Sequence, residues 1–260
     1  MGIEFNPALN SCDFKPNIQI LPRRNSINFG QQLENDRFEC NSPARFTNEK
    51  LISKLIYSNP KVKQILDDSG VALEINTQEL NRLLNTHCKD VQNIAKGITE
   101  NLPFSLQTKV DKKALDNAAY LHDIGKILIP PEILYKNGRL DEQETKIMHK
   151  HSELGYEILK NTNLDKKTLN LIRNHHQNAK KSGYPFVNND FRADLDLQIL
   201  TMADKYSALT EKRPYKEAYS PQQALTIIYA DVKDGKLHPF VFKALAGYVK
   251  GLGTEELQSA

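Results

Sequence analysis

The sequence predicts an all-α protein, because every regular hydrophobic pattern after residue 46 repeats at the helical period. From about Thr47 to about Lys250, apolar residues recur every three to four positions, which places them on one face of a helix. Signals that start and stop helices separate these segments, namely Asp, Ser or Thr at N-caps, proline in first turns and glycine at ends. Histidines and aspartates recur on the apolar faces, so the helices are expected to enclose a polar centre.

Composition limits the class of protein. The chain has 260 residues, enough for one or two domains, and its net charge of +3 is too small to indicate DNA binding. The three cysteines are far apart, so neither a disulfide framework nor a thiolate zinc site is indicated. No apolar run is long enough for a membrane span, and no signal-like segment opens the chain, so we expect a cytoplasmic protein.

We expect four parts along the chain. Residues 1–46 follow neither a helical nor a strand period and are predicted to be a mostly disordered tail. Residues 47–76 should form a short helical segment, with a second helix starting at Pro60. Residues 77–250 carry all seven histidines and form the main domain, and residues 251–260 are a C-terminal tail.

The main domain should begin with one long helix from about Thr77 to about Asn101, with Thr77 as its N-cap. His87 lies within the inward-facing apolar stripe of this helix. Asp111 can cap the next helix, whose C-terminal end carries the adjacent pair His122 and Asp123. This pair can bind divalent metals. Because neighbouring side chains on a helix point about 100° apart, the pair is better placed to bind two ions than to hold one.

A near capping box of Asp141 and Glu144 should start the following long helix. His151 lies in its apolar stripe, whereas His149 falls on the other face and is predicted to be solvated. Gly155 lies one turn after His151 and costs helix stability of about 1 kcal/mol. A glycine at that cost suggests that another element approaches closely.

Three more helical regions complete the domain. Asp165 should cap a helix that ends at His175 and His176, and an irregular stretch follows to about Asp194. The next helix, from about Leu195 to Thr210, carries Asp204 among apolar residues, where a carboxylate needs a cation or hydrogen-bond donors. Two last helices should start after Ser220-Pro221 and His238-Pro239.

The inward faces of these helices thus collect side chains that can bind metals. They are His87, His122, Asp123, His151, His175, His176 and Asp204. Such a set is too large for one ion and fits two, with open positions for water. Lys126 lies one turn after His122 if the helix persists, where it could reach an anion held by the metals. The alternative is a helical bundle whose core histidines simply make hydrogen bonds.

The order of these residues, together with several short motifs, resembles the HD-GYP domain, a subgroup of the HD phosphohydrolases. The motifs are His122-Asp123-Ile124-Gly125-Lys126-Ile127, Gly183-Tyr184-Pro185, Ala203-Asp204 with Ala208-Leu209-Thr210, and Arg213-Pro214-Tyr215-Lys216. The resemblance covers about residues 77–250. It implies an HD-type helical bundle with a metal centre in its core.

The resemblance further implies a phosphodiesterase that hydrolyses the bacterial second messenger cyclic di-GMP to linear pGpG or GMP. It implies that the seven residues named above are metal ligands, with Asp123 bridging two divalent ions. Asp123 and Lys126 would be catalytic. The residues implied to face the substrate are Lys126, Gly183, Tyr184, Pro185, Arg213 and Lys216. Iron or manganese is expected, with zinc and nickel as alternatives, because imidazole and carboxylate suit all of them.

The chain departs from the family pattern at four places. Leu83 stands where some members have a glutamate that helps to hold a third metal, so we expect two metals. Gln177 replaces a usual glutamate, Lys180-Lys181 a usual Asp-Gly, and Ser207 a usual aspartate. The two lysines would attract the dianionic substrate. None of these changes removes an expected ligand, but they alter the residues that support the ligands.

These departures keep two other functions open. One is a catalytically weakened module that serves as a cyclic dinucleotide receptor or as a protein-interaction domain. The other is an HD hydrolase of a different nucleotide. No sensor domain is evident, so regulation would come through residues 1–76 or a partner protein, and a homodimer is compatible with the sequence.

Overall fold

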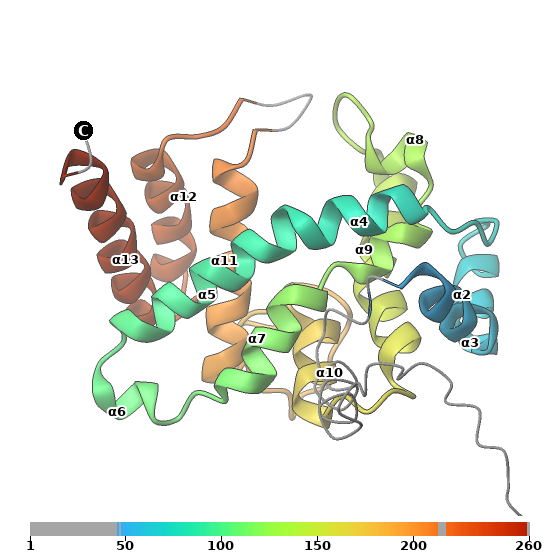
Figure 1. Cartoon of the computed structure of the whole chain (residues 1–260), viewed down its shortest axis with the longest axis horizontal. Helices are drawn as coiled ribbons and strands as arrows, with labels where there is room; N and C mark the ends of the chain where they lie inside the picture. Colours follow the sequence, from blue (N-terminus) through green and yellow to red (C-terminus); the bar gives the residue numbers. More distant parts are fainter. Residues whose placement is uncertain (1–45, 47, 213–216, 259–260) are drawn as a thin grey trace, which may run out of the picture. The chain divides into compact units, whose positions relative to one another are not determined.

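The computed structural model describes residues 46, 48–212 and 217–258, and every regular element within these ranges is a helix (Figure 1). The all-α prediction is therefore confirmed. None of the described helices is both long and apolar enough to cross a membrane. The predicted tail lies outside the described residues except for its last member, Phe46, which is fully buried in the hydrophobic core. Residue 46 therefore belongs to the folded domain.

Two short helices come first, as expected. Helix α2 (Glu49–Tyr57) is capped by Asn48, and α3 (Pro60–Asp67) has Pro60 in its first turn, where a missing N–H costs nothing. Both helices pack against α9 (Glu142–Leu159). The 47–76 segment is thus packed on the helix that carries His151.

The prediction of a single helix from Thr77 to Asn101 is wrong, because the chain forms two helices, α4 (Thr77–Asn85) and α5 (His87–Asn101). Thr86 separates them with φ −119° and ψ −96°, and its hydroxyl donates to the Arg82 carbonyl at 2.7 Å. Such local side-chain hydrogen bonds compete with helix continuation. The cap of α4 is Asn76 rather than Thr77. The break places His87 in the first turn of α5.

Helix α6 (Phe104–Gln107) precedes α7 (Lys112–Leu121), which is capped by Asp111 as predicted. After Asp123 the chain tightens into the 3₁₀ helix η2 (Ile124–Leu128), and α8 (Pro131–Leu134) follows. The HD motif therefore lies at a change of helix type and not inside a continuous α-helix.

The capping signals in the second half predict its helices well. Asp141 and Glu144 form the capping box of α9, and Asp165 caps α10 (Lys166–Asn174). Helix α11 (Leu195–Thr210) has the expected bounds. Ser220 caps the next helix, α12 (Pro221–Lys233), and the last helix is α13 (Pro239–Gln258). Residues 251–258 are helical, so the expected tail after Lys250 is instead a continuation of α13.

The helices that carry ligands pack around α5 and α9. Helix α5 contacts α7, α11 and α13, while η2 packs closely on α9, and α10 packs on both α7 and α9. Figure 1 shows α4 and α5 following one another across the bundle, with α11 passing beside α5. This packing brings the ends of α7 and α10 and the start of α5 to one place.

Candidate metal centre

The structure brings all of the predicted ligands together. His87 begins α5, His122 and Asp123 follow α7, His151 lies within α9, His175 and His176 follow α10, and Asp204 lies within α11. Among the described residues they form two groups, each with one ligand atom per residue within 4.8 Å of the others. The first group contains Asp123, His151, His175 and His176, and the second contains His87, His122 and Asp204.

The imidazole nitrogens of the first group converge. Nε2 of His151 lies 3.2 Å from Nε2 of His175 and 3.1 Å from Nε2 of His176. In the second group, Oδ1 of Asp204 lies 3.1 Å from Nε2 of His87 and 3.7 Å from Nε2 of His122. Each group therefore points several electron-pair donors at a common space.

Asp123 faces both groups. Its Oδ1 atom lies 3.4 Å from Nε2 of His151 and 3.8 Å from Nε2 of His175. Its Oδ2 atom lies 3.5 Å from Nε2 of His87 and 3.4 Å from Nε2 of His122. A single carboxylate thus presents one oxygen to each group, which is the geometry that a ligand shared between two cations needs.

Backbone contacts orient three of the imidazoles. Nδ1 of His122 lies 2.8 Å from the Ala119 carbonyl oxygen. Nδ1 of His151 lies 2.7 Å from the Met148 carbonyl oxygen, and Nδ1 of His175 lies 2.7 Å from that of Ile172. A carbonyl only accepts, so these contacts place the proton on Nδ1 and leave the Nε2 lone pair for a metal.

Two buried atoms in the cluster have no hydrogen-bond partner in the described part of the chain, His122 Nε2 and Asp123 Oδ1. Leaving a buried polar atom unpaired costs about 1 to 3 kcal/mol, and more for a charged group. A cation between the groups would satisfy both atoms. The donor set, the orientation of the rings and these two atoms together fit a bound divalent metal.

The protonation states of His151, His175 and Asp123 also suit a metal, whereas His122 must lose a proton. Burial lowers the pKa of His151 to about 4 and that of His175 to about 3, so both rings are neutral near pH 7. Although burial opposes ionisation, Lys126 and His122 hold the pKa of Asp123 well below its usual range. Although burial opposes protonation, the carboxylates of Asp123 and Asp204 raise the pKa of His122 to about 10. A metal would displace that proton.

A cavity of about 450 Å³ opens onto the cluster, with His87, His151, His176 and Asp204 in its wall. Lys126 also lines it, with Nζ 2.5 Å from Oδ2 of Asp123. The volume falls in the range of small-ligand sites. Lys126 therefore lies between the cluster and the space that a ligand would fill.

The remaining predicted substrate residues divide into three cases. Tyr184 lines the cavity, and its ring lies 4.5 Å from that of His176. Gly183 packs on the ligand segment, because a Cβ there would lie 1.9 Å from the His176 carbonyl oxygen. Pro185 lines a different pocket, and Arg213 and Lys216 lie outside the described residues.

The structure corrects the expectation for His149 and shows the partners of the two lysines. His149 is not simply solvated, because its ring stacks on Tyr184 with centroids 3.6 Å apart. Lys180 and Lys181 are not among the residues that line the cavity, because Lys180 pairs with Asp234 at 2.8 Å and Lys181 donates to the Asn189 carbonyl, so their attraction of the substrate stays a prediction. Both outcomes follow from the path of the loop after His176, which hydrophobic periodicity does not describe.

Two of the departures from the family pattern support the site directly. Ser207 Oγ lies 3.2 Å from Nδ1 of His87. Gln177 donates from Nε2 to the Pro185 carbonyl at 2.6 Å, and its Oε1 accepts from the Gly183 N–H at 3.2 Å. Gln177 therefore holds the backbone on both sides of Tyr184. Leu83 lines the cavity wall and offers no ligand atom.

The cavity residues that sequence reasoning missed include Glu79, Arg82 and Tyr135. The i,i+3 spacing of Glu79 and Arg82 on a helix is a signal that a search for ion pairs would have found. Tyr135 follows α8 and is far from both in sequence, so only the packed structure shows that it joins them.

The fold and the site define an all-helical protein with a buried histidine–aspartate cluster able to hold a metal. The sequence model described as "HD domain" matches residues 61–240, and the chain belongs to that family. Several relatives are named as cyclic dinucleotide phosphodiesterases, which supports an HD-GYP domain and confirms the resemblance found in the sequence.

Three relatives illustrate the similarity. The cyclic di-GMP phosphodiesterase response regulator RpfG of Xanthomonas campestris is 36% identical over 143 residues, which are 54% of this chain and 37% of that protein. The 3′3′-cGAMP-specific phosphodiesterase 2 of Vibrio cholerae is 40% identical over 117 residues, 42% of this chain and 21% of that protein. A cyclic di-GMP phosphodiesterase of Thermotoga maritima is 36% identical over 123 residues, 46% and 33% of the two chains.

The matched region spans less than half of each of these relatives. Among solved structures, the HDG"Y"P protein Bd1817 from Bdellovibrio bacteriovorus aligns with a TM-score of 0.52 and 15% identity. The alignment covers 86% of this chain and 68% of that one, and it supports the fold alone.

Proposed function

We propose that the chain is a metal-dependent phosphodiesterase that hydrolyses cyclic di-GMP to linear pGpG, GMP or both at a dinuclear site. The observation that carries the proposal is the position of Asp123, whose two oxygens face two separate groups of histidine and aspartate ligands. The names of the relatives, which act on cyclic di-GMP or 3′3′-cGAMP, support the substrate class.

The two groups would each hold one divalent ion, with Asp123 as the shared ligand. Neutral imidazoles and ionised carboxylates suit iron and manganese, and zinc and nickel are alternatives. When bound, such ions supply Lewis acidity, which neutralises charge on a phosphodiester and lowers the pKa of water. The chain would provide the remaining functions of binding, orientation and exclusion of water.

Lys126 and Tyr184 line the same cavity and would both act on the substrate. The Lys126 ammonium, held by Asp123, would donate to a phosphoryl oxygen and stabilise the charge that grows on it during attack. Burial raises the pKa of Tyr184, so its hydroxyl keeps its proton and can donate to a phosphate oxygen. The stack of Tyr184 on His149 and its contact with His176 would keep this wall in place.

The test is elemental analysis of anaerobically purified protein, followed by incubation with cyclic di-GMP and Mn(II) or Fe(II). We expect bound metal and a linear product, and His122→Ala should abolish both. Lys126→Ala should keep the metal and lower kcat. Protein that holds no metal and forms no product would refute the proposal.

The contact between Ser207 and His87 favours one other function. Nδ1 of this ligand has a neutral hydroxyl at 3.2 Å and the Glu211 carboxylate only at 3.6 Å, where the resemblance leads us to expect an aspartate, and this weaker support would reduce metal binding or catalysis. The alternative is then a cyclic dinucleotide receptor. Tight binding of cyclic di-GMP without turnover by metal-replete protein would support the receptor, and turnover of a different nucleotide in a substrate panel would support another HD hydrolase.

A further inference from the structure

A buried acid holds an arginine in the wall of the cavity. Glu79 is fully buried, and its two oxygens accept from Arg82 Nε at 2.8 Å and from Arg82 Nη2 at 2.7 Å. The hydroxyl of Tyr135 also donates to this carboxylate. All three residues line the same cavity as His87 and Asp204. The guanidinium of Arg82 is therefore locked in one orientation beside the metal cluster.

The locked arginine keeps donors for a ligand. A guanidinium has five N–H groups in a fixed plane, and Glu79 uses one edge of it. Arg82 lines the cavity and its side chain is 50% exposed, which leaves room for a ligand at the Nη1 and Nη2 donors that Glu79 does not use. Because Glu79 offsets the positive charge, what Arg82 offers is a pair of parallel donors more than a net charge.

Tyr135 adds an aromatic face beside these donors. Its ring centroid lies 5.8 Å from Cζ of Arg82, and the residue is 43% exposed. Parallel donors next to an aromatic face suit a planar ring with two acceptors on one edge. Guanine presents O6 and N7 on such an edge, whereas adenine presents N7 and an amino donor. A phosphate would be drawn more to an uncompensated cation such as an arginine without a carboxylate partner.

We propose that Arg82 and Tyr135 form a guanine-recognition subsite in this cavity, with Glu79 as the positioning residue. The subsite makes the cavity select cyclic dinucleotides that contain guanine over those that contain only adenine. The inference rests on the proposed function in one respect, because it takes the ligand to be a cyclic dinucleotide. It does not require that the ligand be hydrolysed.

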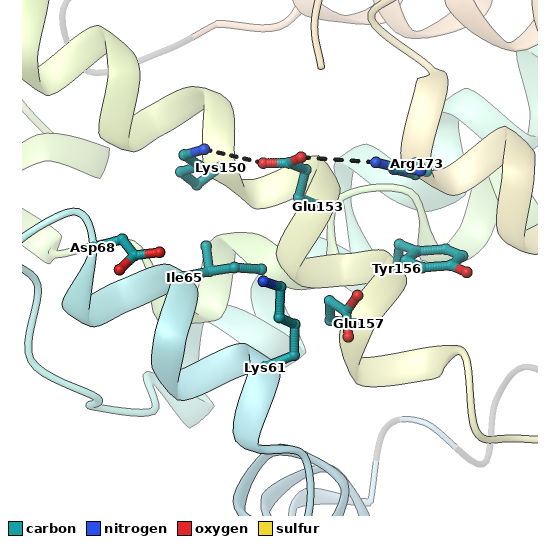
Figure 2. Close-up of a pocket in the computed structure, with 8 residues that line it drawn as sticks. All are labelled: Lys61, Ile65, Asp68, Lys150, Glu153, Tyr156, Glu157 and Arg173. Carbon is teal, nitrogen blue, oxygen red and sulfur yellow. Dashed lines mark hydrogen bonds and ion pairs between the residues drawn. The ribbon is translucent and has the colours of Figure 1, made fainter. Parts of the chain in front are cut away.

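The chain contains a matched control for Arg82. Arg173 lies 3.9 Å from Glu153, and its Cζ lies 5.5 Å from the ring of Tyr156. Figure 2 draws these three residues in their pocket. This arginine, like Arg82, thus has a glutamate and a tyrosine for neighbours. It lines a separate pocket with residues of α3 and α9 that contains none of the cluster residues.

The test is calorimetric binding of hydrolysis-resistant phosphorothioate analogues of cyclic di-GMP and cyclic di-AMP to metal-replete protein, because the proposed enzyme would hydrolyse the natural ligand during the titration. We expect the wild type to prefer cyclic di-GMP by at least tenfold. Arg82→Ala should weaken cyclic di-GMP binding by roughly 10- to 100-fold and change cyclic di-AMP binding by no more than about twofold. Arg173→Ala should change neither. Elemental analysis and thermal unfolding of each variant verify that the metal and the fold are retained.

Arg82→Lys is the second variant, in case Arg82→Ala fails to fold. It keeps a cation for the buried Glu79 but loses the rigid pair of donors. It should lose the guanine preference as Arg82→Ala does. If the Arg82 variants bind both dinucleotides equally more weakly, the inference is overturned and Arg82 contacts the phosphate backbone. A guanine preference that is unchanged in the variants would also overturn the inference, and so would a wild type that binds neither dinucleotide. If the wild type binds but does not hydrolyse, the proposed function fails while the binding ratio still decides this inference.

Discussion

The backbone of Gly125 lies against that of His151 so closely that a Cβ atom on Gly125 would lie 2.0 Å from the His151 carbonyl oxygen. This contact joins η2, which follows the HD pair, to α9, which carries His151. Only a hydrogen fits between them. The glycine therefore allows Oδ1 of Asp123 to come within 3.4 Å of Nε2 of His151.

Replacing Gly125 by alanine should separate η2 from α9 and disrupt the metal cluster. We expect Gly125→Ala to lose about 3 kcal/mol or more of unfolding free energy, because the clash is with backbone that cannot rotate away. Bound metal should fall with it. Urea unfolding and elemental analysis measure the two effects.

Gly155→Ala is the matched control. Its added Cβ would lie 3.5 Å from its nearest neighbours, which is ordinary contact, and alanine favours a helix interior by about 1 kcal/mol. Stability and metal content should therefore be unchanged or slightly higher. Equal losses in the two variants would show that the close approach at Gly125 is not what holds the cluster together.

Gln177 should be needed to hold the loop around Tyr184. Gln177→Ala leaves the Pro185 carbonyl and the Gly183 N–H without their side-chain partner, at a cost of about 1 to 3 kcal/mol. Hydrogen exchange at the Gly183 amide should accelerate, and the KM for cyclic di-GMP should rise. In contrast, Asn178→Ala breaks solvent-exposed bonds and should change stability by less than about 0.5 kcal/mol. An amide as slow to exchange in Gln177→Ala as in the wild type would contradict this role.

Ser207 should tune the affinity for metal through His87. Ser207→Ala removes the hydroxyl 3.2 Å from His87 Nδ1, so the ring loses an orienting contact and metal affinity should fall about tenfold. Competition with a chelator of known affinity measures the change. Ser152→Ala is the control, because it removes a buried hydroxyl next to His151 that donates to the His149 carbonyl and not to a candidate ligand. If both variants bind metal like the wild type, Ser207 does not orient His87.

Metal binding should release a proton from His122. Its pKa in the metal-free protein is raised to about 10, despite the opposing effect of burial, by the carboxylates of Asp123 and Asp204. The ring is therefore protonated at pH 7, and only the neutral ring can bind a metal. Affinity should rise with pH by up to about tenfold per unit between pH 6 and 8.

Calorimetry in buffers with different ionisation enthalpies counts the protons released. We expect close to one proton at pH 7, and His149→Gln, which lies outside the two ligand groups, should release the same number. A metal affinity that stays flat from pH 6 to 8, with no proton released, would show that His122 is already neutral in the metal-free protein.

Short-range signals predicted most of the helices, and their failures have local causes. Asp111, Asp141, Asp165 and Ser220 cap helices as expected, because a cap depends on bonds within a few residues. The break at Thr86 was missed because the helical stripe continues through it, while the hydroxyl of Thr86 bonds back to the preceding turn.

The sequence by itself determined an all-helical protein and the set of candidate ligands, because helical periodicity shows which side chains face the core and the motifs name their types. Tertiary structure alone decided which ligands share a group, that Asp123 faces both groups, and that Arg82 and Tyr135 join the cavity. It also decided that His149 stacks on Tyr184. The reason is that periodicity describes the direction of a side chain relative to its own helix, whereas contacts between helices depend on how the helices cross and where the loops between them run.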